Sequence, residues 1–214
     1  MSRTALLAGS TGLIGNQLLE LLLNDDRYSK IIAISRKKLT ITNAKLVNVV
    51  CELSQLPSHQ EELKADDVFC CLGTTMKRAK SKEAFRAVDF DAPLALAKIS
   101  KEQGAKNFLL VSALGADKNS SIFYNQVKGE VEESLLQIGF NACHIFRPSL
   151  LIGPRQEQRS GEEAAKVFFK IFGWLVPKKY LGIESIKVAK AMLAFAVENQ
   201  QGIFIHESKE MQNF

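Results

Sequence analysis

The chain has 214 residues, of which 46% are hydrophobic, and a formal net charge of +5 at pH 7. This length predicts one packed domain, 1–214, with a sizeable core, and is too short for two large domains. No apolar run is long enough to span a membrane, and the N-terminus runs straight into a predicted strand, which leaves no room for a signal peptide. The four cysteines lack metal-ligand spacing, so we expect a reduced, cytoplasmic protein without structural zinc.

A glycine-rich turn joins the first two predicted elements, a strand at Thr4–Ala8 and a helix at Leu13–Leu23. Gly9 suits the turn, Gly12 the close approach of a phosphate, and Gly15 the packing of helix on strand. Free N–H groups and the positive end of the helix dipole would hold a pyrophosphate. Glycines also mark ordinary turns, but the order of strand, turn and helix favours a dinucleotide site, made of Gly9, Ser10, Thr11, Gly12, Leu13, Ile14 and Gly15.

The second predicted strand, Lys30–Ser35, is followed by Arg36, Lys37 and Lys38. An acid at this place would bind the ribose 2′-hydroxyl, whereas a basic residue accommodates a 2′-phosphate. We expect the Arg36 guanidinium to bind that phosphate, with help from Lys37, and therefore NADP(H) rather than NAD(H) as the cofactor. The alternative is that the three basic residues only make a loop soluble.

Strands and helices continue to alternate along the chain, which predicts a parallel sheet covered on both faces, a doubly wound α/β fold. Two short stretches that follow strands would extend the cofactor site: Glu52 and Leu53 beside the adenine, and Leu72, Gly73 and Thr74 beside the adenosine or pyrophosphate. The remaining strands are expected at Lys45–Val50, Asp67–Leu72, Asn107–Ser112 and Ala142–Phe146, and helices at 82–103, interrupted near Pro93, and at Tyr124–Ile138.

Three residues of the later half could transfer a proton. Ser112 ends the fifth strand, and Tyr124 and Lys128 lie on one face of the following helix because they are four residues apart. An ammonium beside a phenol stabilises its phenolate, so Lys128 would activate Tyr124 and bind the nicotinamide ribose. Ser112 would hold a substrate carbonyl oxygen while Tyr124 donates or removes its proton. A solvent-exposed pair is the usual explanation of Tyr-x-x-x-Lys alone, and only its context favours catalysis.

Residues 148–214 are expected to form the substrate side and a C-terminal helical part. Ala164–Val176 is unusually apolar and reads as core, with a pocket wall, a dimer face or a membrane-surface patch as alternatives. An amphipathic helix is expected at Glu184–Glu198 and a last strand at Gly202–His206. Arg147 is either a site residue or a structural ion-pair partner. The three histidines share no catalytic or metal-ligand spacing and are predicted to be structural: His59, His144 and His206.

The glycine spacing, Ser112 and Tyr124-x-x-x-Lys128 resemble the short-chain dehydrogenase/reductase superfamily, in particular its extended and atypical members. Phe146–Arg155, Val88–Phe90 and Lys187–Met192 also fit. The chain is similar over nearly its whole length to the small Tat-interacting-protein-like oxidoreductases. The resemblance implies a Rossmann fold, NADPH binding, a carbonyl reductase or dehydrogenase activity, and a place for Arg147 and Pro148 beside the nicotinamide.

Two departures from the family pattern bear on the function. The fourth strand ends in Cys71-Leu-Gly73-Thr74-Thr75 rather than Asn-Asn-Ala-Gly, so the family's catalytic Asn has no evident counterpart. The part after the sixth strand is also much shorter than the substrate domain of nucleotide-sugar epimerases, which disfavours sugar-nucleotide chemistry.

The sequence thus predicts an NADPH-dependent oxidoreductase of a small carbonyl substrate, acting as a monomer or homodimer. Two alternatives stay open: a non-catalytic NADPH-sensing regulator that binds a protein partner, and an epimerase-like enzyme that oxidises its cofactor transiently. Nucleic acid is not an expected partner, because aromatic residues do not interleave with the basic runs.

Overall fold

The computed structural model describes residues 2–153, 182–198 and 200–214. In this part of the chain, seven parallel strands form one sheet in the order β3-β2-β1-β4-β5-β6-β9. A separate pair of two-residue strands, β7 and β8, joins Leu151–Ile152 to Ile183–Glu184. The strands of the main sheet are β1 (Arg3–Ala8), β2 (Tyr28–Ser35), β3 (Leu46–Val50), β4 (Asp67–Cys70), β5 (Asn107–Val111), β6 (Ala142–Arg147) and β9 (Gly202–Glu207).

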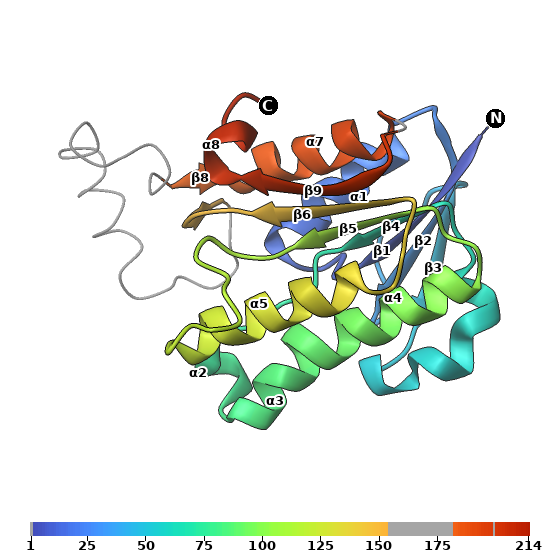
Figure 1. The fold of residues 1–214 in the computed structure, drawn as a ribbon. Coiled ribbons are helices and arrows are strands. Elements are labelled where there is room, and N and C mark those ends of the chain that lie inside the picture. The colour runs from blue at the N-terminus through green and yellow to red at the C-terminus, as the bar shows by residue number, and fades with distance from the viewer. Residues whose placement is uncertain (1, 154–181, 199) are drawn as a thin grey trace.

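Helices cover both faces of the sheet, which confirms the predicted doubly wound α/β fold. Figure 1 shows α1 and α7 on one face and α4 and α5 on the other. None of the described helices is long and apolar enough to cross a membrane. The main helices are α1 (Leu13–Leu23), α4 (Ala92–Glu102), α5 (Phe123–Leu136) and α7 (Ser185–Ala196), and the short ones are α2 (Met76–Ala79), α3 (Lys82–Arg86), α8 (Ser208–Met211) and the 3-10 segment η1 (Leu53–Leu63).

The core consists of two layers, because successive side chains of a strand point to opposite faces of the sheet. Leu7 packs into the layer beneath α1 and α7, together with Leu18 of α1. Leu6 packs into the opposite layer, together with Leu96 of α4. Burial on both sides explains why the strands read as nearly continuous apolar runs.

The predicted helix over 82–103 is interrupted by a π-helical turn, η2 (Ala87–Asp91), between α3 and α4. Pro93 lies in the first turn of α4 and has no N–H to donate to the carbonyl of Asp89, four residues earlier. The wider π turn accommodates this missing bond, so the break falls just before the proline.

Two of the histidines predicted to be structural pack together on the face of the sheet that α7 covers. His144 of β6 and His206 of β9 lie 3.0 Å apart, Nδ1 to Nε2, and their rings stack with Phe195 of α7. Burial, and next the neighbouring His206, lower the pKa of His144 to about 4. His59 is paired with Glu62 near the surface instead. The predicted apolar segment Ala164–Val176 lies outside the described residues.

Candidate active site

The candidate site lies at the carboxyl edge of the sheet, where β1 is flanked by β2 on one side and β4 on the other. The strand order reverses at this point, and the loops that follow β1 and β4 therefore border a crevice. Gly9, directly after β1, has a φ of +88°, and a Cβ there would lie 2.5 Å from the Cys71 carbonyl oxygen. Only glycine fits, because it allows both the backbone angle and the contact between the two loops.

The other two glycines shape the N-terminus of α1. A Cβ on Gly15 would lie 2.1 Å from the Gly9 carbonyl oxygen, which also accepts a 2.9 Å hydrogen bond from the Gly12 amide. Gly12 is exposed and is the N-cap of α1, and no side chain caps this helix. The amides of the first turn thus lack a side-chain partner at an exposed backbone, an arrangement that fits a bound phosphate.

The remaining residues of this turn point in different directions. Thr11 is exposed, whereas Ser10 is buried and its hydroxyl donates to the Ile34 carbonyl of β2 at 3.3 Å. Ile14 belongs to the core beneath α1, and Leu13 is half-buried. The side chains of Ser10 and Ile14 therefore stabilise the turn. Of the side chains in this turn, those of Thr11 and Leu13 are accessible to a ligand.

The residues predicted to bind the adenosine end follow β2 and β3, which are neighbours in the sheet. Arg36 and Lys37 are exposed directly after β2, and Ser35 supports their loop by donating to the Lys37 carbonyl at 2.7 Å. Glu52 is exposed and forms a capping box with Gln55 at the start of η1. Arg36 and Lys37 are thus accessible to solvent, and their binding of a phosphate stays a prediction, whereas Glu52 caps the start of η1.

Lys128 of α5 is 4% exposed, and its Nζ lies 2.7 Å from Oδ1 of Asp89. Burial alone would lower the pKa of Lys128, but the Asp89 carboxylate and then Tyr124 raise it above its ordinary value. A Cβ on Gly73 would lie 3.9 Å from the same Nζ, so the loop after β4 passes beside the ammonium. Lys128 is therefore held as a cation at the border of the crevice.

Tyr124 lies one helical turn before Lys128 and is half-buried. Its ring packs against Phe85 of α3, with 5.6 Å between the ring centroids. The structure thus brings Tyr124 and Lys128 together, as their spacing predicts, and it also places the Gly73 loop beside Lys128, which the sequence did not predict.

Ser112 is buried directly after β5, and its hydroxyl donates to Oε1 of Glu132. Arg147 binds the same carboxylate with two nitrogens, Nη2 to Oε2 at 2.5 Å and Nε to Oε1 at 3.1 Å, and also lies 3.5 Å from Glu207. Arg147 thus makes the ion pairs of the structural alternative, and its contact with a cofactor stays a prediction. Pro148 is buried, and its carbonyl accepts from the Leu114 amide.

Glu132 and Asp89 are the polar residues of this region that sequence reasoning did not assign. Glu132 follows Lys128 by four residues and so shares its helix face, a signal that was available. Asp89 belongs to Val88–Phe90, which fits the family pattern, but nothing in the sequence pointed to its partner, which lies 39 positions away on another helix.

A family model described as NAD(P)H-binding matches residues 9–146. The chain belongs to the NAD(P)H-binding family. This matched region runs from the glycine turn to the end of β6 and includes Ser112, Tyr124 and Lys128.

Relatives and solved structures agree with this assignment. Protein HTATIP2 of Rattus norvegicus is 39% identical over 172 residues, which is 78% of this chain and 71% of the relative. Protein FMP52-1, mitochondrial, of Scheffersomyces stipitis is 29% identical over 218 residues, 97% of this chain and 96% of the relative. The Bordetella bronchiseptica enzyme WbmH, solved with NAD+, matches the fold with a TM-score of 0.75 at 16% identity, covering 97% of this chain and 76% of that one. This member of the NAD(P)H-binding family is therefore an atypical short-chain dehydrogenase/reductase similar to HTATIP2, with a Rossmann fold.

Proposed function

We propose that this chain is an NADPH-dependent oxidoreductase that reduces a small carbonyl substrate with Tyr124 as the general acid. The observation that carries the proposal is that both parts of the candidate site contact the loop after β4. Gly9 touches the Cys71 carbonyl, and Gly73, two residues further on, passes beside Lys128. The phosphate-binding turn and the Tyr124–Lys128 pair therefore border one and the same loop.

The glycine turn fits a dinucleotide, since Gly9 and Gly15 allow the close backbone contacts that shape the turn, Gly12 is exposed, and the α1 N-terminus lacks a side-chain cap. When bound, the nicotinamide cofactor supplies the hydride. Lys128 would bind its ribose and lower the cost of forming a phenolate on Tyr124. Tyr124 would then give its proton to the carbonyl oxygen of the substrate.

Ser112 would hold that oxygen, which requires its hydroxyl to turn away from Glu132, because a hydroxyl has one hydrogen to donate. The two bonds from Arg147 keep the Glu132 carboxylate satisfied when this happens. The exchange of acceptors is thus compatible with the burial of Glu132.

The preference for NADPH over NADH rests on Arg36 and Lys37, which are exposed after β2 with no acidic residue beside them. We further propose that the protein is cytoplasmic, since all four cysteines are free. We also propose that it is a monomer or a homodimer. Cell fractionation decides the compartment, because FMP52-1 is named as mitochondrial, and sedimentation decides the oligomeric state.

The proposal is tested by a panel of aldehydes, ketones and quinones, with NADPH oxidation followed for the wild type and for Tyr124→Phe. We expect at least one compound to be reduced, and the rate to fall by about 10²–10⁴-fold in the variant. Calorimetry with NADPH on both proteins is the control, since the variant should still bind the cofactor. Binding of NADPH without reduction of any compound would favour a sensor, and no binding by folded protein would overturn the proposal.

A further inference from the structure

A buried lysine needs a partner, and Asp89 of η2 is the carboxylate that meets Lys128. The two side chains are 1% and 5% exposed, and Oδ1 lies 2.7 Å from Nζ. The other oxygen, Oδ2, accepts a 2.8 Å hydrogen bond from the Thr74 amide. One carboxylate thus joins the ammonium of α5 to the loop that follows β4.

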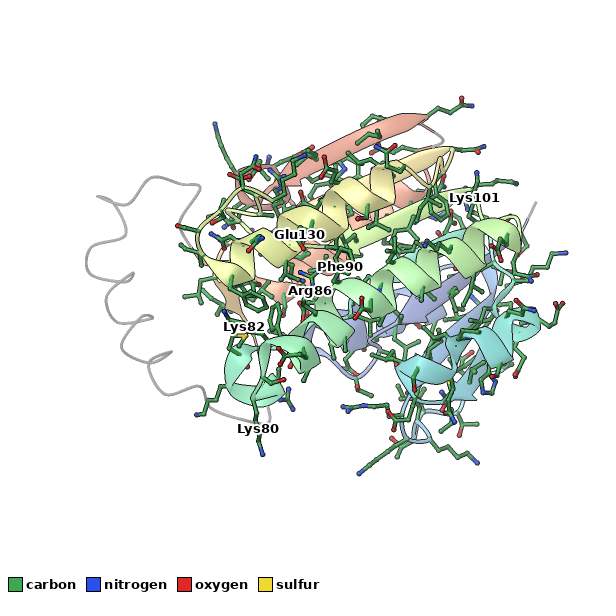
Figure 2. All side chains as sticks on the ribbon, turned by 60° about the horizontal axis from the view of Figure 1, so that its bottom comes forward. Lys80, Lys82, Arg86, Phe90, Lys101 and Glu130 are labelled. Atoms are coloured by element: carbon green, nitrogen blue, oxygen red, sulfur yellow. The ribbon has the colours of Figure 1, made fainter. Side chains whose placement is uncertain are left out.

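Asp89 is held in this place by the packing of α3 and η2 against α5. Phe85 contacts the rings of both Phe123 and Tyr124, at 5.6 Å between centroids in each case. Arg86 contacts both Glu130 and Phe90 (Figure 2): its Nη1 lies 2.6 Å from Oε2 of Glu130, and its guanidinium lies 4.6 Å from the Phe90 ring. The same segment therefore sets both the Tyr124 ring and the Lys128 ammonium.

Three groups act on the charge of Lys128. They are Asp89 from η2, Tyr124 from its own helix and Cys70 from the end of β4. An ammonium taken out of water favours its neutral form unless an opposite charge lies next to it. Tyr124 and Cys70 carry a negative charge only after losing a proton, so Asp89 is the counter-ion at neutral pH.

We propose that Asp89 is a positioning residue of the site, which keeps Lys128 protonated and holds its ammonium between Tyr124 and the Gly73 loop. This inference rests on the proposed function for its meaning in catalysis, but the state of Lys128 is a property of the unliganded protein. It predicts that the site loses its cation, and with it the support for a Tyr124 phenolate, when the carboxylate is removed.

The direct test is an NMR titration of the Lys128 side chain in the unliganded protein, with its signal identified by its loss in Lys128→Arg. In the wild type we expect the ammonium to persist beyond the ordinary lysine range. In Asp89→Asn the midpoint should fall by more than about one pH unit. Glu133→Gln is the matched control, because it removes a carboxylate of the same helix that pairs with Lys118 at the exposed surface, and it should leave the midpoint unchanged. Equal midpoints in wild type and Asp89→Asn would overturn the proposal.

A second readout uses the substrate found in the carbonyl screen. The alkaline loss of kcat should begin at lower pH in Asp89→Asn than in the wild type, whereas Glu133→Gln should keep the wild-type profile. A purely structural role of Asp89 would lower stability without moving this profile. The titration needs neither cofactor nor turnover, so failure of the proposed function leaves its result interpretable.

If Asp89→Asn does not fold, the double variant with Lys128→Met replaces it. Removing the lysine as well abolishes the unpaired buried charge, so the double variant should fold and resist urea better than the single one. A double variant no more stable than Asp89→Asn would show that the two side chains are not coupled, and would reject the proposal.

Discussion

The two edges of the parallel sheet each bury a carboxylate, and the two carboxylates have different surroundings. At the amino edge, Asp67 begins β4 and is completely buried. It accepts hydrogen bonds from Arg3 of β1, Tyr28 of β2 and Asn107 of β5. At the carboxyl edge, Asp89 meets one ammonium and one backbone amide, from a helix and a loop.

This difference separates a buried charge that stabilises the fold from one that acts in the candidate site. The donors to Asp67 come from three strands, so this cluster fixes the positions of strands, and its oxygens are shared among rigid side chains. The partners of Asp89 border the crevice, where ligands of open parallel sheets bind. We therefore expect changes at the amino edge to alter stability and changes at the carboxyl edge to alter binding and turnover.

The largest expected effect is on stability, for Asp67→Asn at the amino edge. Removing one partner of a buried ion pair costs about 3 kcal/mol or more, because the Arg3 guanidinium loses its counter-charge. Urea unfolding measures this loss. The affinity of the remaining folded protein for NADPH should stay within about twofold of the wild type. A larger change would show that the amino edge also affects cofactor binding.

The next prediction concerns how stability depends on pH through the buried pair His144–His206, which lies between the two edges of the sheet. Because the folded protein lowers the pKa of His144 from its ordinary 6.5 to about 4, the unfolded chain binds more protons between these values. Stability is thus complete above about pH 6.5 and falls by about 3 kcal/mol as the pH drops through 4. Burial also lowers the pKa of His206, and the Glu210 carboxylate, 3.1 Å away, opposes part of that lowering by favouring a charged imidazole.

Urea unfolding at a series of pH values checks this prediction. His144→Phe should flatten the profile, whereas replacement of the surface residue in His59→Gln should preserve it. A profile that stays flat down to pH 4 in the wild type contradicts the prediction.

Cofactor preference is the next effect, at the carboxyl edge. Arg36→Asp should lower the ratio of NADPH to NADH affinity by about 10- to 100-fold, because a carboxylate repels the 2′-phosphate and accepts from the 2′-hydroxyl. Calorimetry with both cofactors measures the ratio. Lys38→Asp changes the charge equally at an exposed position not assigned to the cofactor, and should have a much smaller effect. Equal ratios of NADPH to NADH affinity in the two variants would show that Arg36 does not bind the 2′-phosphate.

The smallest effect is expected for Ser112→Ala. We expect kcat/KM for the reduced carbonyl to fall about tenfold and stability to fall by about 1 kcal/mol, since one hydrogen bond to Glu132 is lost. Ser134→Ala is a suitable control, because it also removes a hydroxyl from a bond on α5, to the Glu130 carbonyl. If both variants keep full activity, Ser112 does not contact the substrate and only stabilises the Glu132–Arg147 ion pair.

Local patterns in the sequence were sufficient for most of the fold. The role of Gly15 follows from its spacing, since it packs against Gly9 within the same turn, whereas the contact of Gly9 with the Cys71 carbonyl comes from the loop after β4. The helix break follows from Pro93, and the parallel sheet from the apolar strands. The short elements α2, η1 and α8 were not predicted, because four-residue helices and a 3-10 segment that contains Pro57 have no periodic apolar pattern.

The candidate site was predicted less completely, for a physical reason. Tyr124 and Lys128 share one helix, so their spacing alone places them together. The partners Asp89, Glu132 and Arg147 come from three elements, and only packing decides which of the chain's acidic and basic side chains meet. Ion pairs between distant segments leave no periodic signal in the sequence.

The π turn at Ala87–Asp91 has a consequence for how this segment tolerates changes of length. A π turn holds one residue more than the α-helical turn it replaces. Because the extra residue is taken up within the turn, deleting a single residue there would restore a regular helix in which the parts before and after it keep their relative orientation. Phe85 and Arg86 would then stay on the face of α5, whereas a deletion inside the regular helix α4 would rotate the residues before it by about 100°.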